Sequence, residues 1–261
     1  MSLFSLEDRV ALVTGGGRGI GRGIAEGLAA HGARVVCAAR TQSQLEEVVE
    51  GIRSAGGEAE AVQVDMADLA SVRKCVEETI AHCGRVDILV NNAGTNARMP
   101  IVDVTEEDYD RVMAVNLKGI YFLTQAVARD MIPRKRGKVI NIGSLTTGVG
   151  MPKISIYGAT KGGVGQLTKA QAIEFAEHNI QVNTLCPGFV LTYFTEKIWA
   201  DQAMQAWMKG RLAQGRLATP EDMVGTAIFL ASEASDYVTG QSIFVDGGFM
   251  AGEPWPFPDN V

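Results

Sequence analysis

The sequence predicts an α/β fold, a doubly wound sheet of seven parallel strands flanked by helices on both faces. Short β-rich runs alternate along the chain with longer segments whose apolar residues recur at i, i+3 and i+4. Most of the β-rich runs are continuously apolar, as expected for strands that are covered on both faces. No proline-rich or serine-rich linker and no internal repeat interrupts the alternation, so we expect one domain over residues 1–261.

Each element of this fold has its own signal in the sequence. Amphipathic helices are expected between the strands, for example at 20–32 and 71–84. Thr105 with Asp108 forms a capping-box pattern, and Thr219 followed by Pro220 marks a further helix start. The strands are expected at 9–13, 33–39, 59–64, 86–90, 138–142, 180–185 and 241–245.

The chemically distinctive segments all follow the ends of predicted strands. In order along the chain they are TGGGRGIG, AARTQ, DMAD, NNAGTNAR, GSLTTG and CPGFVLT. Ligands of doubly wound sheets bind at the carboxyl ends of the strands. The convergence of these six segments at one edge therefore predicts a single ligand cleft there.

The composition favours a protein that acts on a small molecule in the cytoplasm. A net charge of −6 and a pI near 5.2 argue against a nucleic-acid partner. No apolar run approaches the ~20 residues that span a bilayer, and MSLFSLEDRV does not read as a signal peptide. Four cysteines without C-x-x-C spacing indicate reduced thiols, and three scattered histidines make a histidine metal site improbable.

The first segment reads as a phosphate-binding loop. Thr14, Gly15, Gly19 and Gly21 match T-G-x-x-x-G-x-G at the junction of a strand and a helix, where glycines permit a tight turn and close approach of a pyrophosphate. A plain glycine-rich turn is the alternative. Arg18 opposes the dipole of the following helix unless an anion binds there, although it could also be a solvated side chain.

The second segment favours NADP(H) over NAD(H). Sites for NAD usually place an acidic residue after the second strand, but here Ala38 and Ala39 precede Arg40, and the first acid is Glu46. An arginine suits the 2′-phosphate of NADP. Asp65, after the third strand, is expected either to bind the adenine or to cap the helix of the following ADLASV segment.

Taken together, the motifs resemble those of the short-chain dehydrogenases/reductases. The resemblance rests on T14-G-x-x-x-G-x-G21, N91-N-A-G94, Asn116, Ser144, Y157-x-x-x-K161 and P187-G188, and it extends to FVDGG near the end of the chain. It implies a Rossmann-type fold, a nicotinamide cofactor and oxidoreductase activity. Y-x-x-x-K alone is a weak pattern, but here it occurs in order with the other motifs.

The resemblance also implies roles for four catalytic residues. Tyr157 would be the general acid or base, and Lys161, one helical turn later, would lower the pKa of the phenol and hold the nicotinamide ribose. Ser144 would bind the substrate oxygen, and Asn116 would hold a water that links Lys161 to solvent. Read alone, Asn116 could equally be a tolerated polar residue on a helix.

The implied binding residues complete the site. The substrate would contact Arg98, Ser144, Thr146, Tyr157 and Tyr193. The cofactor would contact Gly15, Gly17, Arg18, Gly19, Ile20, Gly21, Arg40, Asp65, Met66, Asn92, Ala93, Gly94, Tyr157, Lys161, Pro187, Gly188, Val190 and Thr192.

The substrate is predicted less directly. Residues 188–215 are rich in aromatic residues and Met, and read as a substrate lid or as a helical insert that packs Trp199 and Trp207 into a subunit contact. The blocks around Arg98 are most similar to the gluconate 5-dehydrogenase and 2-deoxygluconate 3-dehydrogenase branch, which implies a sugar acid or keto sugar. Arg98 could bind a carboxylate or polyol, or be a surface arginine.

Two other functions stay open, and the family implies an assembly. The 3-oxoacyl-carrier-protein reductases share most of these motifs, and a dinucleotide-binding sensor could keep the fold without catalysis. A sensor would not need Asn116, Ser144, Tyr157 and Lys161 together. Members of the family are commonly tetramers, so a homotetramer built through helices at about 106–132 and 154–178 is expected.

Overall fold

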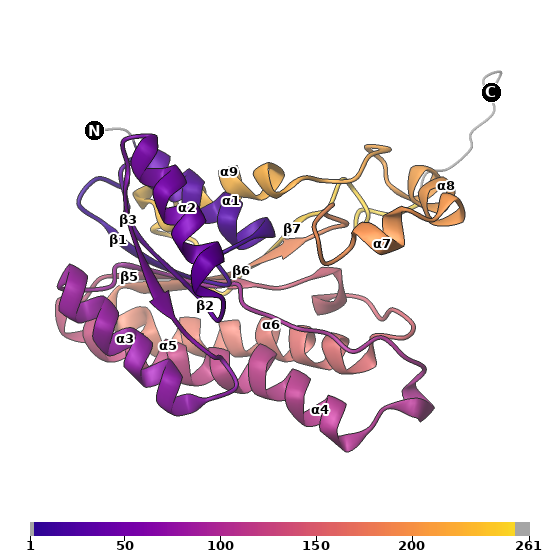
Figure 1. The fold of residues 1–261 in the computed structure, drawn as a ribbon, viewed down its shortest axis with the longest axis horizontal. Coiled ribbons are helices and arrows are strands. Elements are labelled where there is room, and N and C mark those ends of the chain that lie inside the picture. Colours follow the sequence, from indigo (N-terminus) through magenta and orange to yellow (C-terminus); the bar gives the residue numbers. More distant parts are fainter. Residues whose placement is uncertain (1–2, 254–261) are drawn as a thin grey trace.

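A seven-stranded parallel sheet forms the centre of the molecule, in the order β3-β2-β1-β4-β5-β6-β7 (Figure 1). The computed structural model describes residues 3–253, so the ends of the predicted domain at 1–2 and 254–261 lie outside the described residues. The strands are β1 (Val10–Thr14), β2 (Arg34–Ala39), β3 (Glu58–Gln63), β4 (Ile88–Asn91), β5 (Gly137–Ile142), β6 (Ile180–Pro187) and β7 (Ser242–Val245). The predicted fold class is confirmed.

Helices cover both faces of this sheet. In Figure 1, α1, α2 and α9 lie on one side of the strands, and α3, α4, α5 and α6 lie on the other. Their bounds are α1 (Gly19–Ala30), α2 (Gln42–Ser54), α3 (Leu69–Cys83), α4 (Glu106–Met113), α5 (Gly119–Arg134), α6 (Ser155–Phe175), α7 (Glu196–Trp199), α8 (Gln202–Arg211) and α9 (Val224–Ala231).

The side chains of the continuously apolar strands contribute to two hydrophobic cores, one on each face of the sheet. In β1, Ala11 and Val13 pack with α1, α2 and α9, whereas Leu12 packs with α3 and α5. Successive side chains of a strand point to opposite faces, so every residue of a doubly covered strand must be apolar. This packing explains why period-2 alternation is missing from the sequence.

The predicted caps are present, with one exception. The Thr105 hydroxyl accepts a hydrogen bond from the Asp108 amide, and Thr219 and Asp222 form a capping box behind Pro220. Asp65 does not cap the next helix. Asp68 caps α3 by accepting from the Ala70 amide, while Asp65 accepts from the Ala67 amide in the turn before it.

The long helix expected at about 106–132 is divided. A π-helical turn, Ala114–Lys118, separates α4 from α5 and carries Asn116. A Cβ atom on Gly119 would lie 2.4 Å from the carbonyl oxygen of Met66, so the helix can approach the loop after β3 only where it lacks a side chain. Such π turns are frequent at functional sites.

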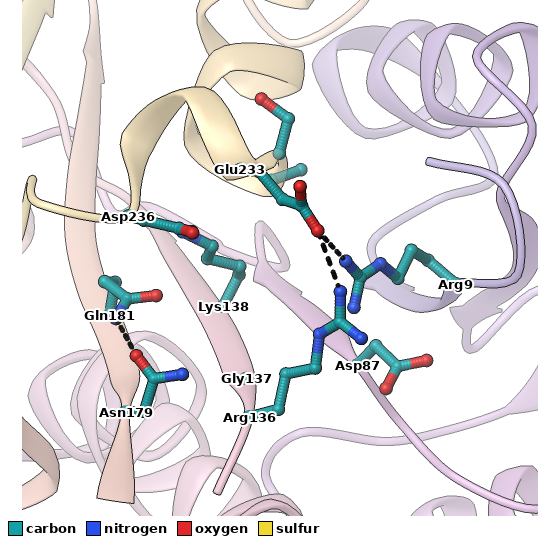
Figure 2. Close-up of a pocket in the computed structure, with 11 residues that line it drawn as sticks. Arg9, Asp87, Arg136, Gly137, Lys138, Asn179, Gln181, Glu233 and Asp236 are labelled. Atoms are coloured by element: carbon teal, nitrogen blue, oxygen red, sulfur yellow. Dashed lines mark hydrogen bonds and ion pairs between the residues drawn. The ribbon is translucent and has the colours of Figure 1, made fainter. Parts of the chain in front are cut away.

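The amino ends of the strands enclose a small charged cavity of about 50 Å³. Figure 2 shows Arg9 and Arg136 directed at the same carboxylate oxygen of Glu233, at distances of 3.0 and 3.1 Å. Beside them, the Lys138 ammonium lies 2.7 Å from Asp236. Each of these cations therefore has an acidic partner.

No helix in residues 3–253 is both long enough and apolar enough to cross a membrane.

Candidate functional site

The carboxyl ends of the strands surround a cleft of about 430 Å³. All six predicted segments contribute to its wall, from the glycine-rich loop after β1 to Pro187 and Gly188 at the end of β6. The prediction that these segments converge on one site is therefore confirmed by the geometry.

The glycine-rich loop is wound so tightly that side chains are excluded from it. Gly15 has a φ of +65°, and a Cβ atom on Gly21 would lie 2.3 Å from the carbonyl oxygen of Gly15. The Asn92 amide donates to the carbonyl oxygens of Thr14 and Gly15, at 2.9 and 3.2 Å. Asn92, predicted only to line the cleft, thus also fastens this loop to the end of β4.

This loop fits a dinucleotide pyrophosphate. It directs the N-terminus of α1 at the cleft, where free backbone amides and the helix dipole favour an anion. Arg18 is the N-cap residue of α1, and its guanidinium lies 4.8 Å from the centre of the Tyr193 ring. The cation of the loop is therefore at the cleft wall, next to a residue of the predicted lid.

The adenosine end of the cleft carries a cation without an acidic partner. Arg40 is exposed at the end of β2, and it lines the cleft with Thr41, Gln44 and Asp65. Within residues 3–253 it forms no ion pair, and the last residues of β2 are Ala38 and Ala39. An unpaired guanidinium at this position can accept a 2′-phosphate.

Three of the predicted catalytic residues meet in the cleft. Ser144 follows β5 and starts a short 3₁₀ turn, while Tyr157 and Lys161 lie one turn apart on α6. The Ser144 hydroxyl acts on the Tyr157 phenol and lowers its pKa. The Lys161 ammonium is 3% exposed, donates to the Ile142 carbonyl oxygen at 2.6 Å and lies 5.6 Å from the centre of the Tyr157 ring.

The electrostatics of this pair differ from the sequence prediction. Burial raises the pKa of Tyr157, and the Ser144 hydrogen bond and the Arg98 charge only partly offset this effect. Burial also lowers the pKa of Lys161 to about 8. The expected lowering of the Tyr157 pKa is therefore not present in the protein alone, since desolvation outweighs the favourable charges.

Asn116 has a structural task that the sequence did not reveal. It is fully buried, and its amide accepts from the Thr95 N–H and donates to the Thr95 carbonyl, each at 2.8 Å. It also donates to the Thr160 hydroxyl at 3.3 Å. Asn116 thus joins the loop after β4 to the helix that carries Tyr157, and its role toward a water stays a prediction.

The residues predicted to bind the substrate do not all line the cleft. Tyr193 lines the cleft and is 70% exposed, whereas Thr146 is buried behind Ser144, with its hydroxyl unpaired within the described residues. Arg98 is exposed, with its guanidinium 4.8 Å from the centre of the Phe194 ring.

The segment predicted to be a lid is folded onto its own small core. It includes α7 and α8, which Figure 1 shows together at the end of the molecule opposite the N-terminus. Trp199 is buried there with Phe249, whereas Trp207 stays half-exposed. Trp199 is therefore packed within the chain, although its buried indole N–H has no hydrogen-bond partner among the described residues. Of the two tryptophans, Trp207 is the more available for the subunit contact that was the alternative.

Several residues of the wall were not predicted from the sequence. Thr95, Arg111 and Phe194 all line the cleft. Thr95 and Phe194 directly follow predicted positions, so extending each motif by a residue would have found them. Arg111 lies within α4, where its ion pair with Asp108 at 2.7 Å resembles any helix-surface pair, so no signal marked it.

Comparison with known proteins assigns this architecture to a family. The family model described as enoyl-(acyl carrier protein) reductase matches residues 15–250. The gluconate 5-dehydrogenase of Gluconobacter oxydans is 42% identical over 246 residues, covering 94% of this chain and 96% of that protein. The chain belongs to the short-chain dehydrogenase/reductase family. Membership confirms the predicted class, an oxidoreductase acting on a CH–OH group.

Other short-chain dehydrogenases/reductases are similar over the same length. The 5-keto-D-gluconate 5-reductase of Escherichia coli is 39% identical over 95% of this chain and 98% of its own. The crystal structure of a gluconate 5-dehydrogenase from Burkholderia cenocepacia, in complex with NADP and tartrate, has a TM-score of 0.92 at 42% identity, covering 95% of this chain and 98% of that one.

Proposed function

We propose that this chain is an NADP(H)-dependent oxidoreductase that transfers hydride between nicotinamide and the hydroxyl/carbonyl pair of a sugar acid or keto sugar. The observation that carries the proposal is the meeting of Ser144, Tyr157 and Lys161 in the cleft at the carboxyl ends of the strands. The relatives that act on gluconate and 5-keto-D-gluconate support the substrate class.

The residues of the cleft divide the work between binding and proton transfer. The nicotinamide, when bound, supplies or accepts the hydride. Tyr157 gives its phenolic proton to the carbonyl oxygen in reduction and takes it back in oxidation, while Ser144 donates a hydrogen bond to the same oxygen. Lys161, with its lowered pKa, is suited to exchange a proton near neutral pH and to hold the ribose.

The cofactor residues are assigned in the same way. We infer that the loop of Gly15, Gly19 and Gly21 holds the pyrophosphate and that Arg40 binds the 2′-phosphate, which would favour NADP(H) over NAD(H). Support comes from the tight turn, from the lack of an acid at the end of β2, and from the NADP-bound structure of a relative. Asp65 remains the proposed adenine contact.

For the 3-oxoacyl-carrier-protein reductase alternative, the basic cluster singled out in the sequence gives no support. An acidic carrier protein requires cations beside the cleft, and Arg134, Lys135 and Arg136 form the cluster in question. Arg134 is paired with Asp87 and Asp130, and Arg136 with Glu233, at the amino ends of the strands. Two of the three cations are therefore paired, and the cluster lies at the edge opposite to the cleft.

We further propose a single domain with a lid at about 188–215 that works as a homotetramer in the cytoplasm. Tyr109, Tyr121 and Ile173, at 46%, 47% and 79% exposure, place apolar surface on α4, α5 and α6, the helices expected at the subunit contact. The four cysteines are free, which suits a reducing compartment. Light scattering of the purified protein tests the assembly.

The function is tested by following the absorbance of reduced nicotinamide. Gluconate, 5-ketogluconate, neutral polyols and 3-oxoacyl thioesters are assayed with each nicotinamide cofactor, and sugar acids with NADP(H) should give the highest kcat/KM. Tyr157→Phe should lower kcat by about 10²–10⁴-fold without changing the Kd for NADPH. Turnover of thioesters alone, or substantial activity of the Phe variant, would contradict the proposal.

A further inference from the structure

Two neighbouring aromatic residues of the predicted lid, Tyr193 and Phe194, line the cleft, and each is in contact with an arginine from another segment of the chain. The Arg18 guanidinium lies 4.8 Å from the Tyr193 ring centre, and the Arg98 guanidinium lies 4.8 Å from the Phe194 ring centre. Arg18 belongs to the glycine-rich loop and Arg98 to the loop after β4. Residues 193–194 thus connect the cofactor end of the cleft to its substrate end.

The backbone beneath this aromatic pair is braced. The Thr195 hydroxyl donates to the Val190 carbonyl oxygen at 2.6 Å and accepts from the Thr192 amide at 3.1 Å. The Thr195 amide in turn donates to the Thr192 carbonyl oxygen at 2.9 Å. These hydrogen bonds hold the backbone on either side of Phe194 in one conformation. The Phe194 ring is therefore presented to Arg98 from a well-defined backbone position.

Stacking on Phe194 prepares Arg98 for a carboxylate. A ring covers one face of the planar guanidinium and leaves the N–H groups of its edge available. One of them reaches the Phe194 carbonyl oxygen at 3.4 Å, and Arg98 has no acidic partner within residues 3–253. A guanidinium held in this way matches the two oxygens of a carboxylate.

Arg98 is also near the reacting centre. Its positive charge is one of the groups that lower the pKa of Tyr157, and Phe194 lines the same cleft as Tyr157 and Ser144. A substrate that presents its hydroxyl to Tyr157 therefore shares the cleft with Phe194, on whose ring the Arg98 guanidinium lies.

We propose that Phe194 is a positioning residue that gives this site its preference for substrates bearing a carboxylate over neutral polyols, because its ring lines the cleft and holds Arg98 beside it. This inference rests on the proposed function, a sugar-acid oxidoreductase, and adds the residue that sets its selectivity.

The test compares Phe194→Leu, Phe194→Tyr and the wild type with gluconate and with the neutral polyol sorbitol. Leu keeps an apolar side chain but has no π face, so KM for gluconate should rise about threefold to tenfold while kcat stays within about twofold. Tyr keeps the ring and should restore the wild-type KM. The ratio of kcat/KM for gluconate over sorbitol should fall in the Leu variant alone.

The controls separate this role from others. The Kd for NADPH, measured by fluorescence, shows that each variant is folded and competent to bind. Equal losses with gluconate and sorbitol, or a Tyr variant as impaired as the Leu variant, would overturn the positioning role of Phe194. Wild-type turnover of no sugar acid would overturn the proposed function itself, which is a different result from an unchanged Leu variant.

Discussion

One lysine is buried near the amino ends of the strands and another near their carboxyl ends, and only the first has a carboxylate partner. Lys138 at the amino end is 9% exposed and Lys161 at the carboxyl end is 3% exposed, and burial lowers the pKa of both. Lys138 lies 2.7 Å from the Asp236 carboxylate, which raises its pKa again in part. Lys161 donates to the Ile142 carbonyl oxygen, and no carboxylate in residues 3–253 pairs with it.

The arginines near the amino and carboxyl ends of the strands also differ in whether they have an acidic partner. At the amino end, Arg9 and Arg136 share Glu233 (Figure 2). At the carboxyl end, Arg18 and Arg98 lie on aromatic rings. Uncompensated buried charge costs stability, so a fold retains a buried cation such as Lys161 where a ligand or a reaction uses it. Arg18 and Arg98 are exposed and do not carry this cost, but like Lys161 they have no acidic partner among the described residues.

The largest expected effect separates the two lysines by activity. Lys161→Met should lower kcat by about 10²–10⁴-fold because it removes the ammonium beside Tyr157. Lys138→Met, the matched change at the other end, should leave kcat within about twofold. Steady-state assays with the best sugar acid measure kcat for both variants. A similar loss of kcat in the two would contradict a special role for Lys161.

The second effect is a dependence of stability on pH. With a native pKa of about 8 against 10.5 when unfolded, Lys161 binds fewer protons in the folded state between these values. The free energy of unfolding should therefore rise with pH across this window, by up to about 3 kcal/mol, and the cost of the buried charge is complete below pH 8.

Lys161→Met removes this titration. Urea unfolding at pH 7 and pH 10 should show the wild type gaining stability relative to the Met variant as the pH rises. A difference between the two proteins that stays constant over this range would mean that Lys161 keeps an ordinary pKa.

A third effect concerns the unpaired cation at the adenosine end. Arg40→Asp should weaken NADPH binding by about tenfold or more and improve NADH binding, because the carboxylate repels a 2′-phosphate and accepts from a ribose hydroxyl. Fluorescence titration with both cofactors measures the change. Unaltered Kd values would show that Arg40 does not contact the ribose substituent.

The smallest expected effects concern the ion pairs at the amino ends of the strands. Asp236→Asn leaves Lys138 with the Ser235 hydroxyl at 3.3 Å and should lower the free energy of unfolding by about 1–2 kcal/mol, with kcat unchanged. Glu233→Gln keeps a side-chain amide oxygen that can still accept from Arg9 and Arg136, so it should cost less than about 1 kcal/mol. Thermal unfolding measures the loss of stability in each of the two variants. A loss of activity in either variant would show that these ion pairs do more than stabilise the fold.

Local patterns predicted most of the fold and the members of the cleft, because strand periodicity and glycine loops are encoded by nearby residues. Contacts between distant segments were not visible. Asn116, for example, lies in a π turn that depends on the approach of Gly119 to Met66. The raised pKa of Tyr157 and the contact of Phe194 with Arg98 likewise arise only when the chain is folded. The cap of α3 is a local feature, but the sequence pattern did not distinguish Asp68 from Asp65.

The hydrogen bonds of Asn92 to the glycine-rich loop have a thermodynamic consequence. Because the amide holds the Thr14 and Gly15 carbonyls, and Gly21 packs directly on Gly15, the loop has one shape before any ligand arrives. The entropy lost in ordering it is part of the free energy of folding rather than of binding. Loosening this attachment would therefore weaken cofactor affinity through entropy, in addition to any contact that Asn92 itself makes with the cofactor.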